Sequence, residues 1–336
     1  MTAPDLDELL RREDRELSRR PSGRQYRIEH GAQRATVVEV GGGLREYSVD
    51  DFPVVDGYPE DDMAAGGRGQ LLIPWPNRLA DGRYQFDERT HQLALSEVAQ
   101  HNAIHGLVRW GAWDVIDASP QSVRLGHVLW PQPGYPFTLA LEVVYDLSDL
   151  GLRVTLAAEN AGRHRAPYGA GQHPYVRAEL AKVDGSLLRL PADTRLETDE
   201  RQIPTGRPLS VEGTEYDFRS PRSIGSMRLD TGFTGLERDA DGLARIDLVS
   251  SDGSRRVAMW LDGGFDYVMA FTGDSLEPAA QRQSLALEPM TCAPDAFRNR
   301  LGLQVLEPGQ RVSASWGLVV GGASRQVAMT TQGAAR

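Results

Sequence analysis

The sequence predicts a single-domain, all-β protein of antiparallel strands, and three observations support this. Apolar residues alternate with other residues through most of the chain, which is typical of strands that bury one face. The 336 residues include 35 Gly and 20 Pro without a repeat, which favours many short strands joined by turns. No rhythm of strand, helix and strand appears, and no linker divides the chain.

The alternation is clearest in the middle of the chain. Apolar residues occupy every second position from Phe137 to Tyr145, and the series resumes at Leu152 after the turn residues Ser148 and Asp149. This pattern predicts a long antiparallel hairpin. The same pattern recurs at residues 84–86, 246–261 and 312–318.

The glycine clusters at residues 41–43 and 66–67 lack the spacing of a phosphate-binding loop, so we interpret them as turns. Before them, Leu6, Leu9 and Leu10 lie at helical spacing and Pro21 ends the pattern. We therefore expect residues 1–23 to form an N-terminal extension with a short peripheral helix. The small and polar residues 326–336 are expected to form a flexible tail.

Composition and charge exclude several classes of partner. The chain carries 37 Lys and Arg against 47 Asp and Glu, a net charge of −10, which argues against nucleic-acid and anionic-membrane partners. It has no apolar stretch long enough for a membrane helix, and its N-terminus lacks the apolar core of a signal peptide. The one cysteine, Cys292, cannot form an internal disulfide, so we expect a cytoplasmic location.

Two of the seven histidines, His105 and His173, stand beside Gly or Pro in loop-like contexts and are candidate site residues. His101 and His105 are four residues apart, a metal-ligand spacing on a helix. Gly106 follows at once and no acidic or cysteine ligand accompanies the pair, so we expect no metal site. The remaining histidines that we interpret as surface or half-buried residues are His30, His91, His127 and His164.

Glu288 closes the apolar run SLALEPM just before Pro289, so we expect its carboxylate where a strand stops. Partial burial there would raise its pKa toward the range of a general base, and an exposed strand-end glutamate is the alternative. We interpret Cys292 as a small buried hydrophobe, since no nucleophile motif surrounds it.

Five separated blocks carry a resemblance to a known family. They occur in the order IPWPNRLADGRYQFDERTHQL, NAIHGLVRWGAWDV, QHPYV, LDTGFTGL and LALEPMTCAPDAF. In this order they resemble the aldose 1-epimerase (galactose mutarotase-like) family, from about Arg24 to Gly321.

The resemblance implies a large antiparallel β-sandwich in one domain, here residues 24–325, with a sugar in an open cleft across one sheet. It implies His173 as the catalytic acid and Glu288 as the catalytic base. The residues implied to bind the sugar or to support that binding are Arg78, His105, Asp230 and Asn77. Trp75, Trp110 or Tyr175 could stack on a sugar face, although core packing is at least as common for such aromatics.

The implied activity is interconversion of the α and β anomers of a free aldose without a cofactor. Glu288 would act as a carboxylate and His173 as an imidazolium, so each is expected to hold the other charged. A non-catalytic sugar-binding protein on the same fold and a hexose-phosphate mutarotase are the alternatives. For the latter, the candidate phosphate ligands are Arg83, Arg109 and Arg177. The expected partner is a small sugar, and the protein is expected to be a monomer or homodimer.

Three positions depart from the family pattern. Val176 stands where an aromatic residue is common, Gln172 where asparagine is common, and Leu107 where a second glycine is common. These differences surround the two histidines without replacing them, so they bear on the preferred sugar more than on the reaction.

Overall fold

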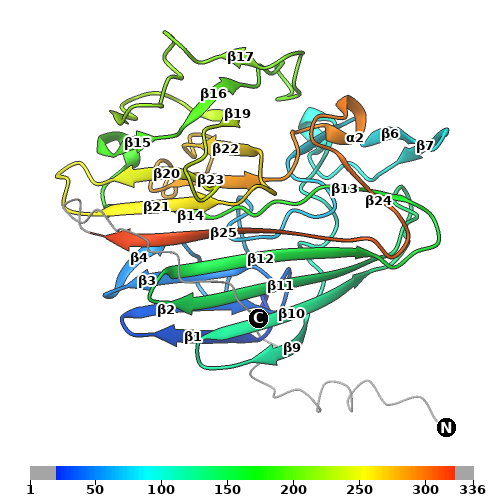
Figure 1. Ribbon diagram of the computed structural model, residues 1–336, viewed down its shortest axis with the longest axis horizontal. Coiled ribbons are helices and arrows are strands. Elements are labelled where there is room, and N and C mark those ends of the chain that lie inside the picture. Colours follow the sequence, from blue (N-terminus) through cyan, green and yellow to red (C-terminus); the bar gives the residue numbers. More distant parts are fainter. Residues whose placement is uncertain (1–19, 322–336) are drawn as a thin grey trace.

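The computed structural model describes residues 20–321, which fold into two large antiparallel sheets stacked face to face (Figure 1). In spatial order, the ten-stranded sheet contains β1 (Gln25–His30), β2 (Gln33–Val38), β3 (Leu44–Val49), β4 (Phe52–Val55), β14 (Tyr175–Val176), β23 (Leu285–Met290), β22 (Tyr267–Phe271), β19 (Asp230–Leu236), β16 (Ala192–Arg195) and β17 (Leu209–Ser210). The nine-stranded sheet contains β18 (Arg222–Ser223), β15 (Leu187–Arg189), β20 (Ala244–Val249), β21 (Arg256–Leu261), β25 (Arg311–Gly321), β12 (Gly151–Asn160), β11 (Leu139–Ser148), β10 (Ser122–Leu129) and β9 (Asp114–Ala118).

Smaller elements lie at one end of the two sheets. The short strand pairs are β5 (Arg78–Ala80) with β8 (Asn102–Ile104), β6 (Arg83–Phe86) with β7 (Arg89–Gln92), and β13 (Ala166–Tyr168) with β24 (Gln304–Leu306). Among residues 20–321 the short helices are η2 (Val98–Gln100), which precedes β8, α2 (Ala296–Asn299), and η3 (Val183–Gly185), which precedes β15 at the other end of the sheets. Figure 1 shows α2 beside β6.

The core lies between the two large sheets. Along β11 the side chains at Leu139, Leu141, Val143 and Tyr145 are buried, whereas the residues between them are half-buried. This alternation follows from the two-residue repeat of a strand, which sends successive side chains to opposite faces. The predicted hairpin is confirmed, because β11 pairs with β12 in antiparallel register through a turn at residues 149–150.

Strand β23 is buried along its whole length, because it is central in its sheet and covered on both faces. Leu285 and Leu287 belong to the main core, whereas Met290, on the opposite face, packs in a second small cluster. Glu288 lies on that second face and is 2 % exposed.

The expectation that a strand stops at Glu288 was therefore wrong. The strand continues through Pro289, whose missing N–H does not prevent its carbonyl from accepting a hydrogen bond from the Gln172 amide (3.2 Å).

A buried amide connects the two sheets. The Gln172 side chain donates to the Tyr145 hydroxyl (2.8 Å) and to the carbonyl of Gly69 (3.1 Å), and it accepts from the Trp316 indole N–H (3.1 Å). Gln172 is fully buried and precedes His173, whereas Tyr145 and Trp316 belong to the nine-stranded sheet. Every polar atom of this side chain is thus used to fix the segment that carries His173.

The single-domain, all-β prediction is confirmed, and positive φ at Gly41, Gly42, Gly66 and Gly67 agrees with turns there. The predicted helix at about residues 5–20 and the predicted tail at 326–336 lie outside the described residues, apart from Arg20 itself. Among residues 20–321, no helix is long and apolar enough to cross a bilayer.

We predict that Gln172→Leu destabilises the protein, because the buried Trp316 N–H loses its partner, whereas the Gly69 carbonyl keeps its hydrogen bond from the Leu44 amide. Each buried group left unpaired costs about 1–3 kcal/mol. Urea unfolding measured by tryptophan fluorescence should show the loss. Gln121→Leu, at an exposed position in the β9–β10 turn, is the matched control and should leave the midpoint unchanged. Equal midpoints for both variants would contradict a stabilising role for the amide.

Candidate active site

The ten-stranded sheet brings Glu288 and Asp230 to one face. Strand β22 lies between β23 and β19. Its Met269 pairs with Glu288 of β23, and its Phe271 pairs with Asp230, the first residue of β19. Met269 and Phe271 are two residues apart and so point to the same face, as do their direct partners. His173 reaches this place from the segment before β14, which pairs with β23 on its other side.

Arg78 and His105 come from the β5–β8 pair. Asn77 and His105 are joined twice, because the His105 amide donates to the Asn77 carbonyl (2.9 Å) and the Asn77 amide donates to Nδ1 of His105 (3.2 Å). Nδ1 of His105 is therefore the acceptor, and the neutral ring carries its proton on Nε2. The Asn77 side chain also accepts from the amide of Arg78 (2.8 Å), which agrees with the expected support of the arginine.

His173 and Glu288 form a buried acid–base pair. Nε2 of His173 lies 3.2 Å from Oε1 of Glu288, and the two residues are 4 % and 2 % exposed. The His105 ring packs edge-on against His173, with 5.4 Å between ring centroids. Three of the predicted site residues thus form one cluster.

Burial favours the uncharged form of both partners. Burial, followed by smaller contributions that include nearby Arg68, Arg109 and Arg78, lowers the pKa of His173 to about 3. Burial, assisted by the negative charge of Asp230, raises the pKa of Glu288 well above its usual value. This differs from the carboxylate and imidazolium that the sequence analysis assigned to the two residues, because desolvation disfavours the charged form of each.

The proton count of the pair is nevertheless the one that acid–base chemistry needs. An uncharged carboxyl beside a neutral imidazole and a carboxylate beside an imidazolium both hold one exchangeable proton between them. They differ only in the position of that proton across a 3.2 Å contact. Nδ1 of His173 and Oε2 of Glu288 are buried with no hydrogen-bond partner among residues 20–321, which marks them as sites for a ligand's polar groups.

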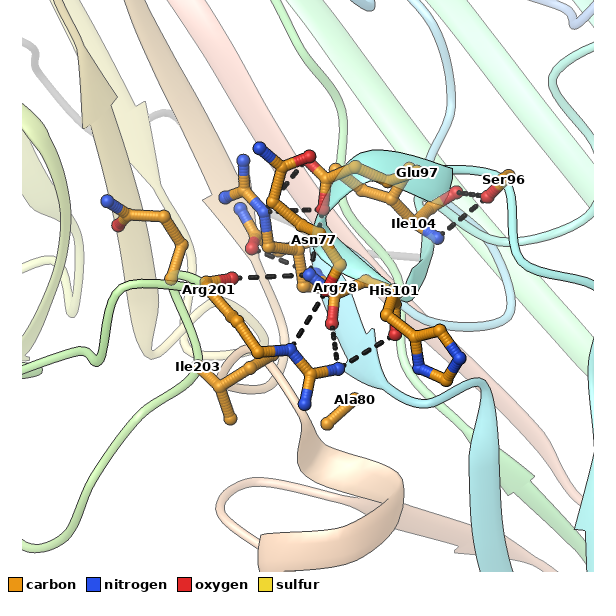
Figure 2. Close-up of polar contacts among 12 residues, drawn as sticks. Asn77, Arg78, Ala80, Ser96, Glu97, His101, Ile104, Arg201 and Ile203 are labelled. Atoms are coloured by element: carbon orange, nitrogen blue, oxygen red, sulfur yellow. Dashed lines mark hydrogen bonds and ion pairs between the residues drawn. The ribbon is translucent and has the colours of Figure 1, made fainter.

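Sequence reasoning missed the group that orients Arg78. Nε of Arg78 donates to both carboxylate oxygens of Glu97 (3.1 and 3.0 Å), and Oε2 of Glu97 also accepts from the side-chain amide of Asn102 (2.9 Å). Arg201 in turn donates to the Asn102 side chain (3.0 Å) and to the His101 carbonyl (2.8 Å). Figure 2 shows Arg78, Glu97 and Arg201 in this network.

Arg78 is thereby held by its Nε edge, and among residues 20–321 its two terminal nitrogens make no hydrogen bond, which leaves them able to donate to a ligand. Nearby Asp230 is half-buried; burial raises its pKa, and Arg78 opposes that rise. No local motif marks Glu97 in the sequence LSEVAQHN, since the pairing depends on the fold.

A stack behind His173 was also missed. The Tyr175 ring lies parallel to His173 with 4.9 Å between centroids, and its hydroxyl donates to the carbonyl of Gly66 (2.7 Å). The Arg68 guanidinium covers Tyr175 at 4.5 Å from its ring centroid. Gly67 has φ +77°, and a Cβ there would approach the His173 ring to 2.6 Å. Glycine at this position therefore allows the turn to pack closely against the histidine ring.

The remaining candidates are dispersed. Trp75 is buried against Phe297 and belongs to the core, and Trp110 is half-exposed beside Arg109. His101 is largely exposed and bonds Asp81 (3.0 Å), so it does not share a site with His105.

The three arginines proposed for a phosphate also differ in position. Arg83 is exposed on β6, and Arg177 is paired with Asp56. Arg109 is half-buried and near enough to both site histidines to lower their pKa.

Within residues 20–321, one group of side chains has donor atoms that could converge on a metal ion. This group consists of His105, His173 and Glu288. Those atoms lie within 4.8 Å of one another. A cation would have to displace the hydrogen bond between His173 and Glu288, whereas acid–base chemistry uses that bond directly.

The chain is similar to several known proteins. Residues 24–318 match the family model described as aldose 1-epimerase. The uncharacterized protein YihR of Escherichia coli (strain K12) is 35 % identical over 290 residues, which is 86 % of this chain and 91 % of that protein. Maltose epimerase of Levilactobacillus brevis is 27 % identical over 250 residues, 68 % of this chain and 72 % of the relative.

A solved structure described as the GalM/aldose epimerase homologue from C. elegans has a similar fold. It superposes with a TM-score of 0.79 at 18 % identity and covers 89 % of this chain and 99 % of that chain. With the family model matched over most of its length, the chain belongs to the aldose 1-epimerase family.

Proposed function

We propose that the protein is a mutarotase that opens and recloses the ring of a free aldose, with Glu288 and His173 as its proton-transfer pair. The observation that carries this proposal is the buried pair itself. Its members lie 3.2 Å apart, share one proton, and each keep one polar atom without a protein partner. Mutarotation needs one group that removes the proton of the anomeric hydroxyl and one that protonates the ring oxygen.

The reaction can be balanced within this pair. The proton of the Glu288 carboxyl passes to His173, so that a carboxylate faces the anomeric hydroxyl and an imidazolium faces the ring oxygen. Glu288 then takes the hydroxyl proton while His173 gives its proton to the ring oxygen, the bond between C1 and the ring oxygen breaks, and the aldehyde forms. This returns both residues to the uncharged state that burial favours. After rotation about the C1–C2 bond, the same steps in reverse close the ring on the other face.

Arg78, Asp230 and His105 are proposed to hold the sugar hydroxyls. Arg78 offers donors fixed by Glu97, Asp230 offers an acceptor, and His105 offers Nε2–H because Asn77 occupies its Nδ1. Fixed partners of this kind convert binding into orientation, which raises the rate of a positioned proton transfer.

Two other functions would use the same fold. A non-catalytic sugar-binding protein would need residues that hold the sugar, such as Arg78 and Asp230, but not the proton-transfer pair. In this protein both members of the pair are present. A hexose-phosphate mutarotase would need cations at the rim, and Arg109 is the candidate nearest the histidines. A cytoplasmic location and a monomeric or homodimeric state remain predictions.

We predict that the purified protein accelerates the approach to anomeric equilibrium of at least one free aldose, followed by polarimetry on freshly dissolved anomers. The panel should include reducing disaccharides, since one relative is named maltose epimerase. Pre-treatment with EDTA should leave the rate unchanged, because the proposed acid and base are both side chains. Uncatalysed rates across the panel, with folded protein confirmed by circular dichroism, would favour the binding-protein alternative.

Removing either member of the pair should lower kcat by about 10²-fold or more with the fold intact, because one positioned proton transfer is lost. The variants are Glu288→Gln and His173→Asn. Glu29→Gln and His30→Asn, on the outer strand β1, are the matched controls and should retain full activity.

Arg78→Ala and Asp230→Asn should raise KM, since they remove contacts with the sugar rather than a proton. Near-full activity in Glu288→Gln would assign the base to another carboxylate.

The pH dependence of kcat/KM should be bell-shaped, because the active pair holds one proton. As pH falls through the His173 pKa of about 3, the pair gains a second proton and no base remains. As pH rises through the elevated pKa of Glu288, the pair loses its only proton and the ring oxygen has no donor.

Both limbs are properties of the coupled pair. The acid limb follows protonation of the neutral imidazole and the basic limb follows ionisation of the carboxyl, which is the reverse of the order that the free side chains suggest. An acid limb above about 6.5, the ordinary pKa of histidine, would contradict this order.

A further inference from the structure

We propose that a cavity lined by β6 and α2, outside the catalytic cluster, binds a small phosphate-bearing anion. Its volume of about 440 Å³ lies within the range of small-ligand pockets. The charged residues that line it are Arg83 of β6, Arg298 of α2, Arg300 just after α2, and Asp81. None of the three residues of the catalytic cluster lines the cavity, so a ligand here would leave the place of the reacting sugar free.

One wall of the cavity is rigid before a ligand arrives. Tyr84 of β6 and Phe297 of α2 are both buried, and their ring centroids lie 4.9 Å apart. The Tyr84 hydroxyl donates to the carbonyl of Gly134 (2.8 Å), which fixes the ring at its far end. Arg83 precedes Tyr84 and Arg298 follows Phe297 in the chain. The backbone that carries both arginines is therefore already packed in place, which lowers the entropic cost of binding.

The charge of the lining favours an anion. Three arginine side chains line the cavity against one carboxylate, that of Asp81. This carboxylate is also shared, since it lies 3.5 Å from Nη1 of Arg298 and accepts a hydrogen bond from Arg201 outside the cavity (3.0 Å). The chain as a whole carries a net charge of −10, so this local excess of positive charge opposes the overall balance. An anionic ligand would supply the negative charge that the lining lacks.

Two of the three arginines have no carboxylate partner. Among residues 20–321, the guanidinium group of the exposed Arg83 makes no hydrogen bond or ion pair. Arg300 donates through one terminal nitrogen to the carbonyl of Gln85, which is a neutral acceptor. Arg165 bonds the nearby Asp87 carboxylate (2.8 and 2.9 Å) and lowers its pKa, with a smaller contribution from Arg300, so this acid is already engaged. Arg83 and Arg300 are therefore available to a ligand.

Phosphate is the anion that these donors suit best. A planar guanidinium group donates two parallel hydrogen bonds to oxygens of one anionic group, and a phosphate offers three or four such oxygens where a carboxylate offers two. Several guanidinium groups around one cavity therefore favour a phosphate over a carboxylate. The cavity is larger than a phosphate ion, so either a free phosphate or the phosphate group of a small ester fits it.

The test is calorimetric titration of the full chain with inorganic phosphate and with glycerol 3-phosphate, at a constant ionic strength set by sodium chloride. We expect saturable binding of at least one of the two compounds. The double variant Arg83→Gln/Arg300→Gln should raise its Kd about tenfold or more, because charge-assisted hydrogen bonds are lost. Arg27→Gln/Arg163→Gln, which removes the same charge at exposed positions elsewhere, is the matched control and should leave the Kd unchanged.

Arg83→Gln alone should also raise the Kd, and it decides the matter if the double variant does not fold, because the Arg83 guanidinium has no polar partner among residues 20–321. Tighter binding of glycerol 3-phosphate than of inorganic phosphate would assign the site to a phosphate ester, and the reverse order would assign it to the free ion. The absence of saturable binding of either compound would overturn the proposal. Equal Kd values for the unmodified chain and the Arg83 variants would also overturn it, since the phosphate would then lie elsewhere, such as at Arg78 in the cleft.

Discussion

The site depends on the buried side chain of Gln172, which ties the segment carrying His173 to the opposite sheet. Its amide bonds Tyr145 and Trp316 of the nine-stranded sheet, while its backbone amide bonds the carbonyl of Pro289 beside Glu288. His173 and Glu288, the proposed acid and base, are therefore both tied to one residue that is proposed for neither role. A buried amide whose polar atoms are all paired is rigid, because each alternative rotamer would leave a buried group unsatisfied.

Burial also decides the electrostatics. Central placement of β23 removes Glu288 from water, and the neighbouring stack of Tyr175 and Arg68 encloses His173. Desolvation then favours the uncharged pair, with one proton free to lie on either partner. A reaction that moves a proton in both directions is favoured by such a pair. Because bulk water does not stabilise the charged form of either group, the proton can move from one group to the other in either direction.

The cleft is assembled from elements that are distant in the chain. Arg201, in the loop after β16, bonds Asn102 of β8; Asn102 bonds Glu97, and Glu97 orients Arg78. The same loop, through Glu197 and Gln202, lines a cavity of about 480 Å³ that also includes Asp230. The orientation of Arg78 and the shape of this cavity thus share one set of hydrogen bonds.

Sequence alone determined the fold class and the family, because period-two alternation and turn chemistry are local properties of each strand, and short motifs such as HPY and LEP keep their order along the chain. It also placed His105, His173, Asp230 and Glu288 as candidates. Only the tertiary structure decided that Glu288 lies inside a strand and not at its end, that Glu97 holds Arg78, and that desolvation favours the uncharged forms of His173 and Glu288. These properties depend on which strands are central and which side chains cover them, and both follow from long-range pairing that local patterns do not encode.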